Sequence, residues 1–356
     1  MWRGAIRQIV FTTEYTELKE CAESLLDCAV IMAANCEIVT LMTLPALHPL
    51  KLVPALHSKV WGGRKLATQL GKALPTPEPY GESWELHDSC RVLNGRLRGR
   101  SLGELLKTYG QALVGAGHDA GAGFPLLAKF IDAQDWLSIQ VHPDDQQARE
   151  LEGEPRGKNE AWLVLAAEPD AQLVIGLQPG TDRAQLAEAI QAGTLEALLV
   201  YKNVQADDVL SLPAGTVHAL GPGILIYEIQ QASDRTYRLY DWGRLGLGGK
   251  PRDLHIDKGL SVANLASLPQ VTHPQGELLI DGAYFRTWRH QLHDEALSLA
   301  SQGCFQALTC IAGELQIHTT GQDSLPLRLG ETSLLPACID SFTLRGSGCI
   351  IRSCPA

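Results

Sequence analysis

The chain has 356 residues, enough for one large domain or two smaller ones with a sizeable buried core. Apolar residues make up 45% of it and charged residues 20%, as in an ordinary globular protein rather than a disordered or fibrous one. The formal net charge of -10 argues against nucleic acid or an anionic membrane as a partner. An anionic small molecule would need a local basic pocket that works against this overall field.

The nine cysteines are scattered, and none forms a CxxC pair, so neither a zinc finger nor a thioredoxin-like motif is predicted. Thiols without a disulfide framework suggest a reducing compartment. The apolar stretch at 28–42 is interrupted by Asn35 and Glu37 and has no basic start, so it resembles neither a transmembrane helix nor a signal peptide. We therefore expect a cytoplasmic protein.

Three regions are predicted along the chain. Residues 1–43 are expected to be an N-terminal extension, disordered or the product of a mis-assigned start, with Met42 as the first residue of the functional chain. Residues 44–265 are expected to form the catalytic domain. The pattern of residues 266–356 predicts many short strands separated by glycines. Such a pattern is typical of a second β-sandwich or jelly-roll unit, which is expected to hold no metal.

The expected elements of the middle region alternate between strand and helix. A loop-rich stretch comes first and contains a short helix at 102–113. Helices are also expected at 144–151 and at 182–192, the latter with Thr181 as its N-cap. Short apolar runs that end in turn residues predict strands at 124–132, 136–142, 161–165, 172–176, 201–204 and 208–213.

Four residues have the spacing of a metal site. Gln140 and His142 are two apart on a predicted strand, so their side chains project from the same face. Glu160 follows after a loop and a helix, and a Pro-Ala-Gly-Thr-Val turn leads into His218. Two imidazoles, a carboxylate and an amide oxygen suit Zn²⁺, with Mn²⁺, Co²⁺ or Fe²⁺ as substitutes. Such a set fits a partly open catalytic ion better than a closed structural one.

This two-part pattern is typical of cupin barrels. Eight segments around it narrow the match further: Pro49–Leu52, Trp61–Gly63, Gly81–Glu85, Phe124–Asp132, Leu137–Asp145, Gly157–Glu160, Leu212–His218 and Tyr227–Arg244. Together they resemble type I mannose-6-phosphate isomerase in its short bacterial form. The resemblance runs from about residue 44 to the end and is strongest up to about residue 265. It implies a mainly β fold, with a cupin jelly-roll barrel, a helical or loop insertion and a degenerate C-terminal cupin unit.

The resemblance further implies an isomerase that interconverts mannose 6-phosphate and fructose 6-phosphate with one Zn²⁺ per chain. Its metal ligands map onto the four residues already selected by spacing. Its essential arginine maps onto Arg238, with Arg235 as the near rival, and its active-site lysine maps onto Lys158. Asp234, in the same segment as Arg238, is a candidate either for the base or for an acceptor of a sugar hydroxyl, and sequence does not assign the base, because assignment requires geometry.

Substrate-binding residues are expected from the same segments. Ser138 lies two residues before Gln140 and shares the inward face of the strand, so its hydroxyl is expected to contact either the substrate or the core. The resemblance implies that Glu82 and Trp61 line the pocket, and structural packing next to its two glycines is the alternative role of Trp61. Lys129 is expected either to bind phosphate or to extend to the surface. His87 and His255 are interpreted as surface or core histidines.

Two other functions fit a cupin barrel. A sugar-binding or regulatory cupin would need neither Lys158 nor Arg238 beside the metal. An oxygen-using cupin would hold Fe²⁺ by His and carboxylate, but the Gln ligand and the phosphosugar-type segments argue against it. A small sugar phosphate is the expected partner, and the chain is expected to be a monomer or a weak homodimer.

Overall fold

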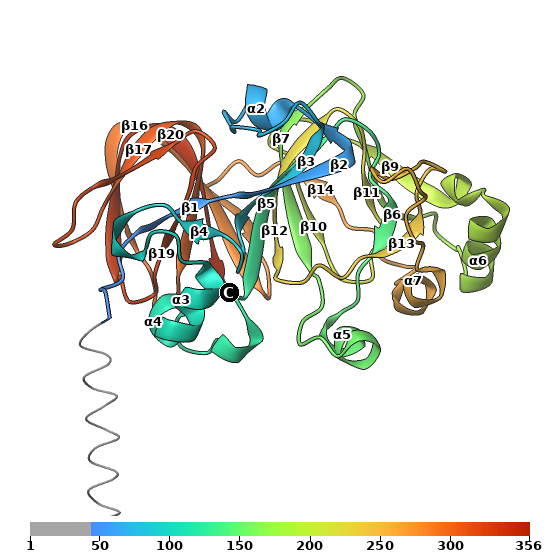
Figure 1. The fold of residues 1–356 in the computed structure, drawn as a ribbon. Coiled ribbons are helices and arrows are strands. Elements are labelled where there is room, and N and C mark those ends of the chain that lie inside the picture. Colours follow the sequence, from blue (N-terminus) through green and yellow to red (C-terminus); the bar gives the residue numbers. More distant parts are fainter. Residues whose placement is uncertain (1–43) are drawn as a thin grey trace, which may run out of the picture. The chain divides into compact units, whose positions relative to one another are not determined.

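A seven-stranded antiparallel sheet organises the middle of the chain in the computed structural model, which describes residues 44–356 (Figure 1). Its central strands are mostly apolar and largely buried, because both of their faces are covered. In spatial order they are β14 (Val271–Thr272), β10 (Val209–Leu212), β7 (Glu160–Ala167), β12 (Ile224–Gln231), β5 (Leu126–Ala133), β2 (Ala55–Gly63) and β3 (Tyr80–Leu86).

Two smaller sheets complete this part of the fold. Trp162 and Ile226 of the seven-stranded sheet share one hydrophobic cluster with Leu173 and Leu220 from the three-stranded sheet. The two sheets therefore enclose a common core, as in a jelly roll. The three-stranded sheet contains β11 (Ala219–Leu220), β8 (Gln172–Leu177) and β9 (Leu199–Asn203), and the two-stranded sheet contains β13 (Tyr237–Tyr240) and β6 (Ile139–Val141).

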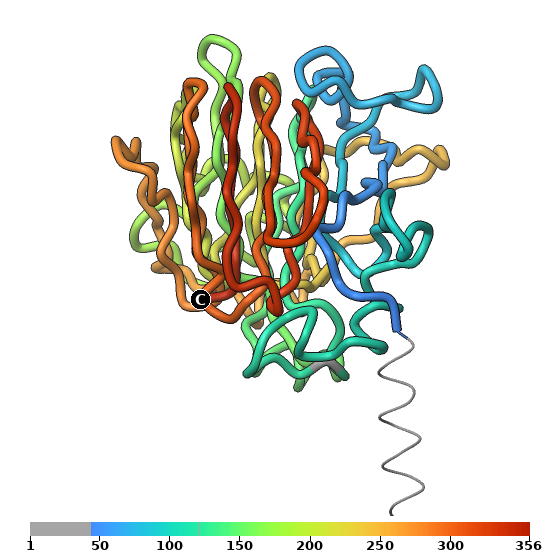
Figure 2. Tube along the Cα trace, turned by 90° about the vertical axis from the view of Figure 1, so that its left-hand side faces the viewer, coloured from blue at the N-terminus to red at the C-terminus, as the bar shows by residue number. Residues whose placement is uncertain are grey.

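The C-terminal region forms a sheet of its own, whose long strands run side by side in Figure 2. It also takes in two strands from the start of the described chain, so the consecutive strands β1 and β2 belong to different sheets. In spatial order the strands are β15 (Leu278–Asp281), β16 (Phe285–Ala300), β20 (Ser341–Pro355), β17 (Gln306–His318), β19 (Thr332–Leu335), β1 (Leu50–Val53) and β4 (Arg91–Val92), and β18 (Leu325–Arg328) pairs with β17.

Helices are short and connect the strands. The helix expected at 102–113 is divided at Gly110, whose φ of 49° is unfavourable for other residues. The N-cap expected at Thr181 is instead Asp182, whose carboxylate accepts from the Gln185 amide in a capping box. The α-helices are α2 (Lys65–Thr68), α3 (Leu102–Tyr109), α4 (Gln111–Val114), α5 (Asp145–Glu152), α6 (Arg183–Ala192) and α7 (Ile256–Val262), and the 3-10 helices are η1 (Gly95–Leu97), η2 (Ala120–Ala122) and η3 (Leu195–Leu198).

Strand periodicity sorts the side chains of the seven-stranded sheet into two sets. On β12, Leu225, Tyr227 and Ile229 join a cluster that also contains Phe305 and Ile351 of the C-terminal region. The alternate residues of this strand face the other way, toward the three-stranded sheet and the cavity described below. The sheet therefore has one face for packing and one for a site.

The mainly β architecture is as predicted. The extension expected at residues 1–43, and with it the expected start at Met42, lies outside the described residues. Residues 47–356 form one compact unit, and the domain boundary at residue 265 stays a prediction. Within the part of the chain that the structure describes, no helix has the length and apolarity to cross a membrane.

Candidate metal and substrate site

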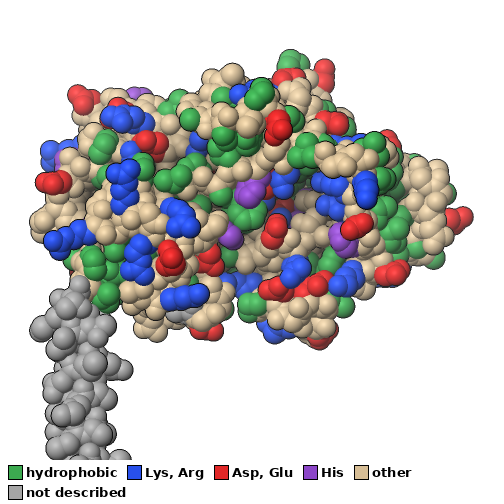
Figure 3. All heavy atoms as spheres, viewed as in Figure 1, with side chains coloured by type: hydrophobic (Ala, Val, Ile, Leu, Met, Phe, Trp, Pro, Cys, Tyr) green, Lys and Arg blue, Asp and Glu red, His purple; other side chains and the backbone are tan. Residues whose placement is uncertain are grey.

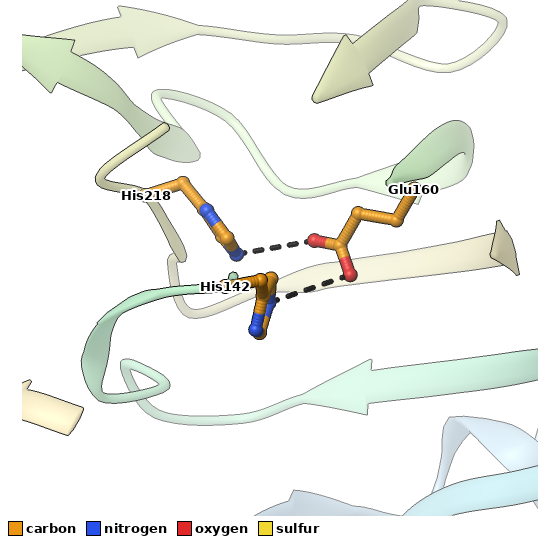
Figure 4. Close-up of side chains that lie close together, drawn as sticks. All are labelled: His142, Glu160 and His218. Carbon is orange, nitrogen blue, oxygen red and sulfur yellow. Dashed lines mark ion pairs between the residues drawn. The ribbon is translucent and has the colours of Figure 1, made fainter. Parts of the chain in front are cut away.

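Three of the expected ligands meet in the structure, as the close-up in Figure 4 shows. The potential ligand atoms of His142, Glu160 and His218 all lie within 4.8 Å of one another, and all three residues are buried. Nε2 of His218 is 3.1 Å from Glu160 Oε1, and Nε2 of His142 is 3.6 Å from Glu160 Oε2. A group of this size and composition can hold a divalent ion.

Both histidines are oriented by their other ring nitrogen. Nδ1 of His142 is 2.9 Å from the Arg235 carbonyl oxygen, and Nδ1 of His218 is 2.9 Å from that of Thr216. A carbonyl only accepts, so each Nδ1 carries the proton and each Nε2 is left with a lone pair toward Glu160. Burial and the Lys158 ammonium hold the pKa of His142 well below its usual value, which keeps that imidazole neutral.

The turn before His218 is built on one glycine. Gly215 has a φ of 86°, and its amide donates to the carbonyl oxygen of His142 over 2.8 Å. A β-carbon at this position would lie 3.1 Å from the Val262 carbonyl oxygen. The turn therefore joins the segments of the two histidine ligands, and glycine allows both its conformation and its close approach.

Gln140 lies beside the same cluster. Its backbone forms a bridge with His218, and its side-chain Nε2 is 3.2 Å from His218 Nε2. The two ends of an amide side chain exchange by a rotation of half a turn, which would turn its oxygen toward the cluster. The amide is therefore within reach of the position expected of a fourth ligand.

Glu160 is the charged centre of the cluster. Burial by itself raises its pKa, but the charge of the Lys158 ammonium beside it is the main cause that outweighs burial and brings the pKa well below the usual value. Lys158 Nζ lies 2.8 Å from Glu160 Oε2 and 3.2 Å from His142 Nε2. Neither Glu160 oxygen has a hydrogen bond of good geometry. A buried, charged carboxylate whose oxygens lack good hydrogen bonds is what a cation-binding site would provide.

A cavity of about 440 Å³ opens beside the cluster. That volume is typical of a small-molecule site. Seven Lys or Arg residues line it against four Asp or Glu residues, although the whole chain is acidic. Figure 3 shows basic side chains around a hollow in the right-hand half of this face. The local basic pocket that an anionic ligand needs is therefore present.

The residues expected to bind substrate all line this cavity. Trp61 is 3% exposed and is also part of the hydrophobic core. The Ser138 hydroxyl lies 3.4 Å from Gln140 Oε1. Glu82 accepts from the Trp84 indole, and although burial opposes the shift, Lys129 and Lys59 lower its pKa to about 2.

The residues expected to be catalytic line the cavity as well. Lys158 is buried, whereas Asp234 is exposed on the loop before β13. Arg238 lies on β13 directly opposite Gln140 of β6. Its rival Arg235 reaches the same cavity, but its guanidinium pairs with Glu154 and its side chain is 46% exposed.

Sequence reasoning missed part of the lining. Lys129, left open between two roles, forms a buried ion pair of 3.0 Å with Glu228, which was not singled out. Lys59, Arg252 and Lys258 also line the cavity. The available signal was a lone charge within an apolar run, in Leu-Leu-Ala-Lys-Phe-Ile and Leu-Ile-Tyr-Glu-Ile. His255 also lines the cavity, whereas His87 packs edge-on against Trp84.

The fold and the site together define a cupin-type protein with a His-Glu-His cluster at a basic cavity. Comparison with known proteins agrees. Residues 50–161 match the family described as phosphomannose isomerase type I, catalytic domain, and residues 276–355 match the mannose-6-phosphate isomerase cupin domain. The mannose-6-phosphate isomerase of Streptococcus mutans is 34% identical over 86% of this chain and 98% of its own.

A relative and a solved structure come from Bacillus subtilis. Its mannose-6-phosphate isomerase ManA is 36% identical over 85% of this chain and 98% of the relative. A crystal structure of a Bacillus subtilis mannose 6-phosphate isomerase superposes with a TM-score of 0.78 at 31% identity, covering 86% of this chain and 99% of that one. The chain is an enzyme that belongs to the type I mannose-6-phosphate isomerase family, which confirms the expected family and cupin fold.

Proposed function

We propose that the protein interconverts mannose 6-phosphate and fructose 6-phosphate, with one Zn²⁺ per chain. The observation that carries this proposal is the convergence of His142, Glu160 and His218 at a basic cavity, in a chain of this family. The cavity has the size for one phosphosugar. Its excess of cations suits a phosphate ester, which is strongly anionic at neutral pH.

The donor set supports the choice of metal. Two Nε2 lone pairs, a carboxylate without good hydrogen bonds and a nearby amide are borderline-hard ligands. They suit Zn²⁺, and Mn²⁺, Co²⁺ or Fe²⁺ are the expected substitutes. When bound, the ion would supply Lewis acidity that polarises the sugar oxygens. Lys158 contacts two of the ligand atoms, so it must give up one of these contacts to a bound cation.

The reaction moves a proton between C1 and C2 through a cis-enediol(ate), so it needs a base and a means of stabilising oxyanion charge. Lys158 and Arg238 are the proposed stabilisers, because both are cations at the cavity and both lie beside proposed ligands. Asp234 is the proposed base, because its exposed carboxylate lines the same cavity.

Three further residues are proposed to hold the substrate. Glu82 keeps its charge at neutral pH, so it is a hydrogen-bond acceptor for sugar hydroxyls. Ser138 presents a hydroxyl next to Gln140. Trp61 offers an apolar wall that is fixed by its packing in the core.

An assay coupled to the formation of fructose 6-phosphate tests the function. We expect turnover with Zn²⁺, loss of turnover with a chelator, and recovery when Zn²⁺ is added back. His142→Ala and His218→Ala are expected to lose both metal and activity, whereas His293→Ala, an exposed position on β16, should change neither. Metal content is measured by elemental analysis.

Three outcomes would contradict the proposal. A chelated, metal-free protein with full turnover would remove the metal from the reaction. Tight binding of mannose 6-phosphate without turnover would indicate a sugar-binding cupin. Oxygen uptake with Fe²⁺ in place of isomerisation would indicate an oxygen-using cupin.

A further inference from the structure

Two cysteines lie next to each other in the C-terminal sheet, and neither lines the cavity of the metal and substrate site. Cys304 is in the loop that leads into β17, and Cys354 is near the end of β20. Strand pairing brings these two segments together, because Ala307 of β17 lies opposite Ser353 of β20. The side chains of Cys304 and Cys354 are joined by a hydrogen bond. The fold therefore pairs two thiols that are far apart in the sequence.

A buried amide orients the Cys304 sulfur. Gln306 is 1% exposed, and its Nε2 donates to Cys304 Sγ over 3.3 Å and to the Ser301 carbonyl oxygen over 2.9 Å. The Gln306 oxygen lies 3.5 Å from Nη1 of Arg352, a guanidinium that only donates. The nitrogen end of the amide is therefore the end that faces the sulfur, and it favours a sulfur that carries negative charge.

Arg352 supplies positive charge beside the two thiols. It is 8% exposed, and its guanidinium lies 4.0 Å from the centre of the Trp288 ring. Among the described residues, no carboxylate lies within ion-pair distance of this guanidinium, and its Nε has no hydrogen-bond partner. Its charge acts on both Cys304 and Cys354. A cation without a counter-ion stabilises an anion nearby, and a thiolate is the anion that this cluster can form.

The surroundings give the two thiols different acidities. The hydrogen bond from Cys354 is the main cause that lowers the pKa of Cys304 to about 7, although burial opposes the shift. The pKa of Cys354 is raised, because its thiol takes part in that hydrogen bond and is buried. Near neutral pH, Cys304 is therefore partly a thiolate, while its neighbour keeps its proton.

Exposure also distinguishes the two cysteines. Cys304 is partly exposed and follows two exposed residues, Gln302 and Gly303, whereas Cys354 is only 3% exposed. A small oxidant can thus reach Cys304 first. Burial raises the pKa of the other described thiols, which are Cys90, Cys310, Cys338 and Cys349. An acidic, accessible thiol beside a second thiol is the arrangement found in cysteines that sense oxidants.

We propose that Cys304 and Cys354 are a redox-active thiol pair, which a hydroperoxide converts reversibly into a disulfide. The Cys304 thiolate attacks the terminal oxygen of the hydroperoxide, so an S–O bond forms while the O–O bond breaks, and the oxygen that leaves takes a proton from water. The Cys354 sulfur then attacks the sulfenic acid, the S–S bond replaces the S–O bond, and the hydroxide leaves with the Cys354 proton as water.

The electrons balance in both directions. Two electrons pass from the two thiols to the hydroperoxide, and a dithiol reductant returns two electrons when it reopens the disulfide. A reversible disulfide of this kind is compatible with a reducing compartment, where disulfides are transient. The inference does not depend on the proposed isomerase activity, because neither cysteine lines the cavity.

The test is alkylation of the full chain followed by peptide mass spectrometry, which measures each of the nine cysteines separately. At pH 7, iodoacetamide is expected to alkylate Cys304 about tenfold faster than Cys338, which is exposed but has a raised pKa. Hydrogen peroxide should then join Cys304 to Cys354, and dithiothreitol should restore both thiols. Turnover of mannose 6-phosphate by the reduced Cys304→Ser chain should equal that of the wild type.

Matched variants separate the two roles. Cys354→Ser keeps a hydroxyl that can donate to Cys304, so peroxide should still oxidise Cys304 but stop at the sulfenic acid, which dimedone traps. Cys304→Ser should give neither a sulfenic acid nor a disulfide at this pair. Cys338→Ser, which removes an exposed thiol, should leave formation of the disulfide unchanged. Thermal unfolding of each variant checks that the fold is retained.

Measurements on the wild-type chain alone can overturn the proposal. Alkylation of Cys304 no faster than that of Cys338 would refute the activated thiol. A peroxide-induced disulfide between Cys304 and Cys338 would refute the assigned partner. Conversion of Cys304 to sulfinic acid while Cys354 stays reduced would show that the second thiol does not resolve the first.

Discussion

Arg235 and Arg238 lie three residues apart but in very different surroundings. Arg235 points its guanidinium to Glu154 at the surface, and only its backbone oxygen contacts a ligand, His142. Arg238 is half-buried on β13, opposite Gln140, and has no carboxylate partner among the described residues. At this scale, the role of a residue follows from what its charge is already paired with.

This difference leads to a prediction for turnover. Arg238→Ala should keep the metal and lower kcat about a hundredfold or more, the effect of removing a charge-stabilising donor from an active site. Arg235→Ala removes an exposed ion pair, so kcat should fall far less. Steady-state kinetics and metal analysis on both variants measure this. A larger loss of kcat from Arg235→Ala than from Arg238→Ala would assign the charge-stabilising role to Arg235 instead.

The connection from α5 to β7 shows how an element places the site. Asp144 caps α5, and the Lys158 amide then donates to the Pro143 carbonyl oxygen, which closes the segment back onto the start of the helix. Gly157 lies inside this closure, where a β-carbon would come within 2.5 Å of the Pro143 oxygen. The position of Lys158 therefore depends on a glycine that touches no ligand.

Gly157→Ala is expected to push the two segments apart. The cost should be about 1 to 3 kcal/mol of unfolding free energy, as for other overpacked positions, and isomerase activity should fall with it. Gly248→Ala, where a β-carbon meets nothing, is the matched control and should be nearly neutral. Urea unfolding and kinetics measure both. A Gly157→Ala protein with unchanged stability and activity would show that the closure is not needed.

Across the whole molecule, a buried polar network ties the two large sheets together. Glu85 of β3 is 1% exposed, accepts from Thr332 of β19 over 3.1 Å, and pairs with Lys72 at 2.5 Å. Lys72 also donates to the Gly330 carbonyl oxygen. The sheet that carries the site is thus joined to the C-terminal sheet by charge as well as by the shared apolar cluster.

Removing one partner of this network should be costly. Glu85→Ala leaves the Lys72 ammonium buried without its carboxylate, so we expect a loss of about 3 to 5 kcal/mol of unfolding free energy. Glu168→Ala removes the exposed partner of Lys65 and should cost no more than about 1 kcal/mol. Chemical denaturation compares the two variants. Equal small losses would mean that the network does not join the sheets energetically.

The sequence by itself determined the local parts of this protein. Side chains along a strand alternate between its two faces, so Gln140 and His142, which are two residues apart, lie in one region. The proline and glycine before His218 set the turn that leads into the cluster. These patterns depend only on neighbours in the chain, so spacing was sufficient to select them. The helix break at Gly110 and the cap at Asp182 are local too, but competing turn and cap residues nearby concealed them.

Only the tertiary structure decided which charges meet. Lys129 faces Glu228 because β5 and β12 pair in one register, and a shift of one residue would turn both away from the cavity. Asp241 holds Arg252 beside Arg238 because a loop returns to β13. Such pairings join residues that the sequence keeps apart, and their energy depends on burial, which the linear order does not contain.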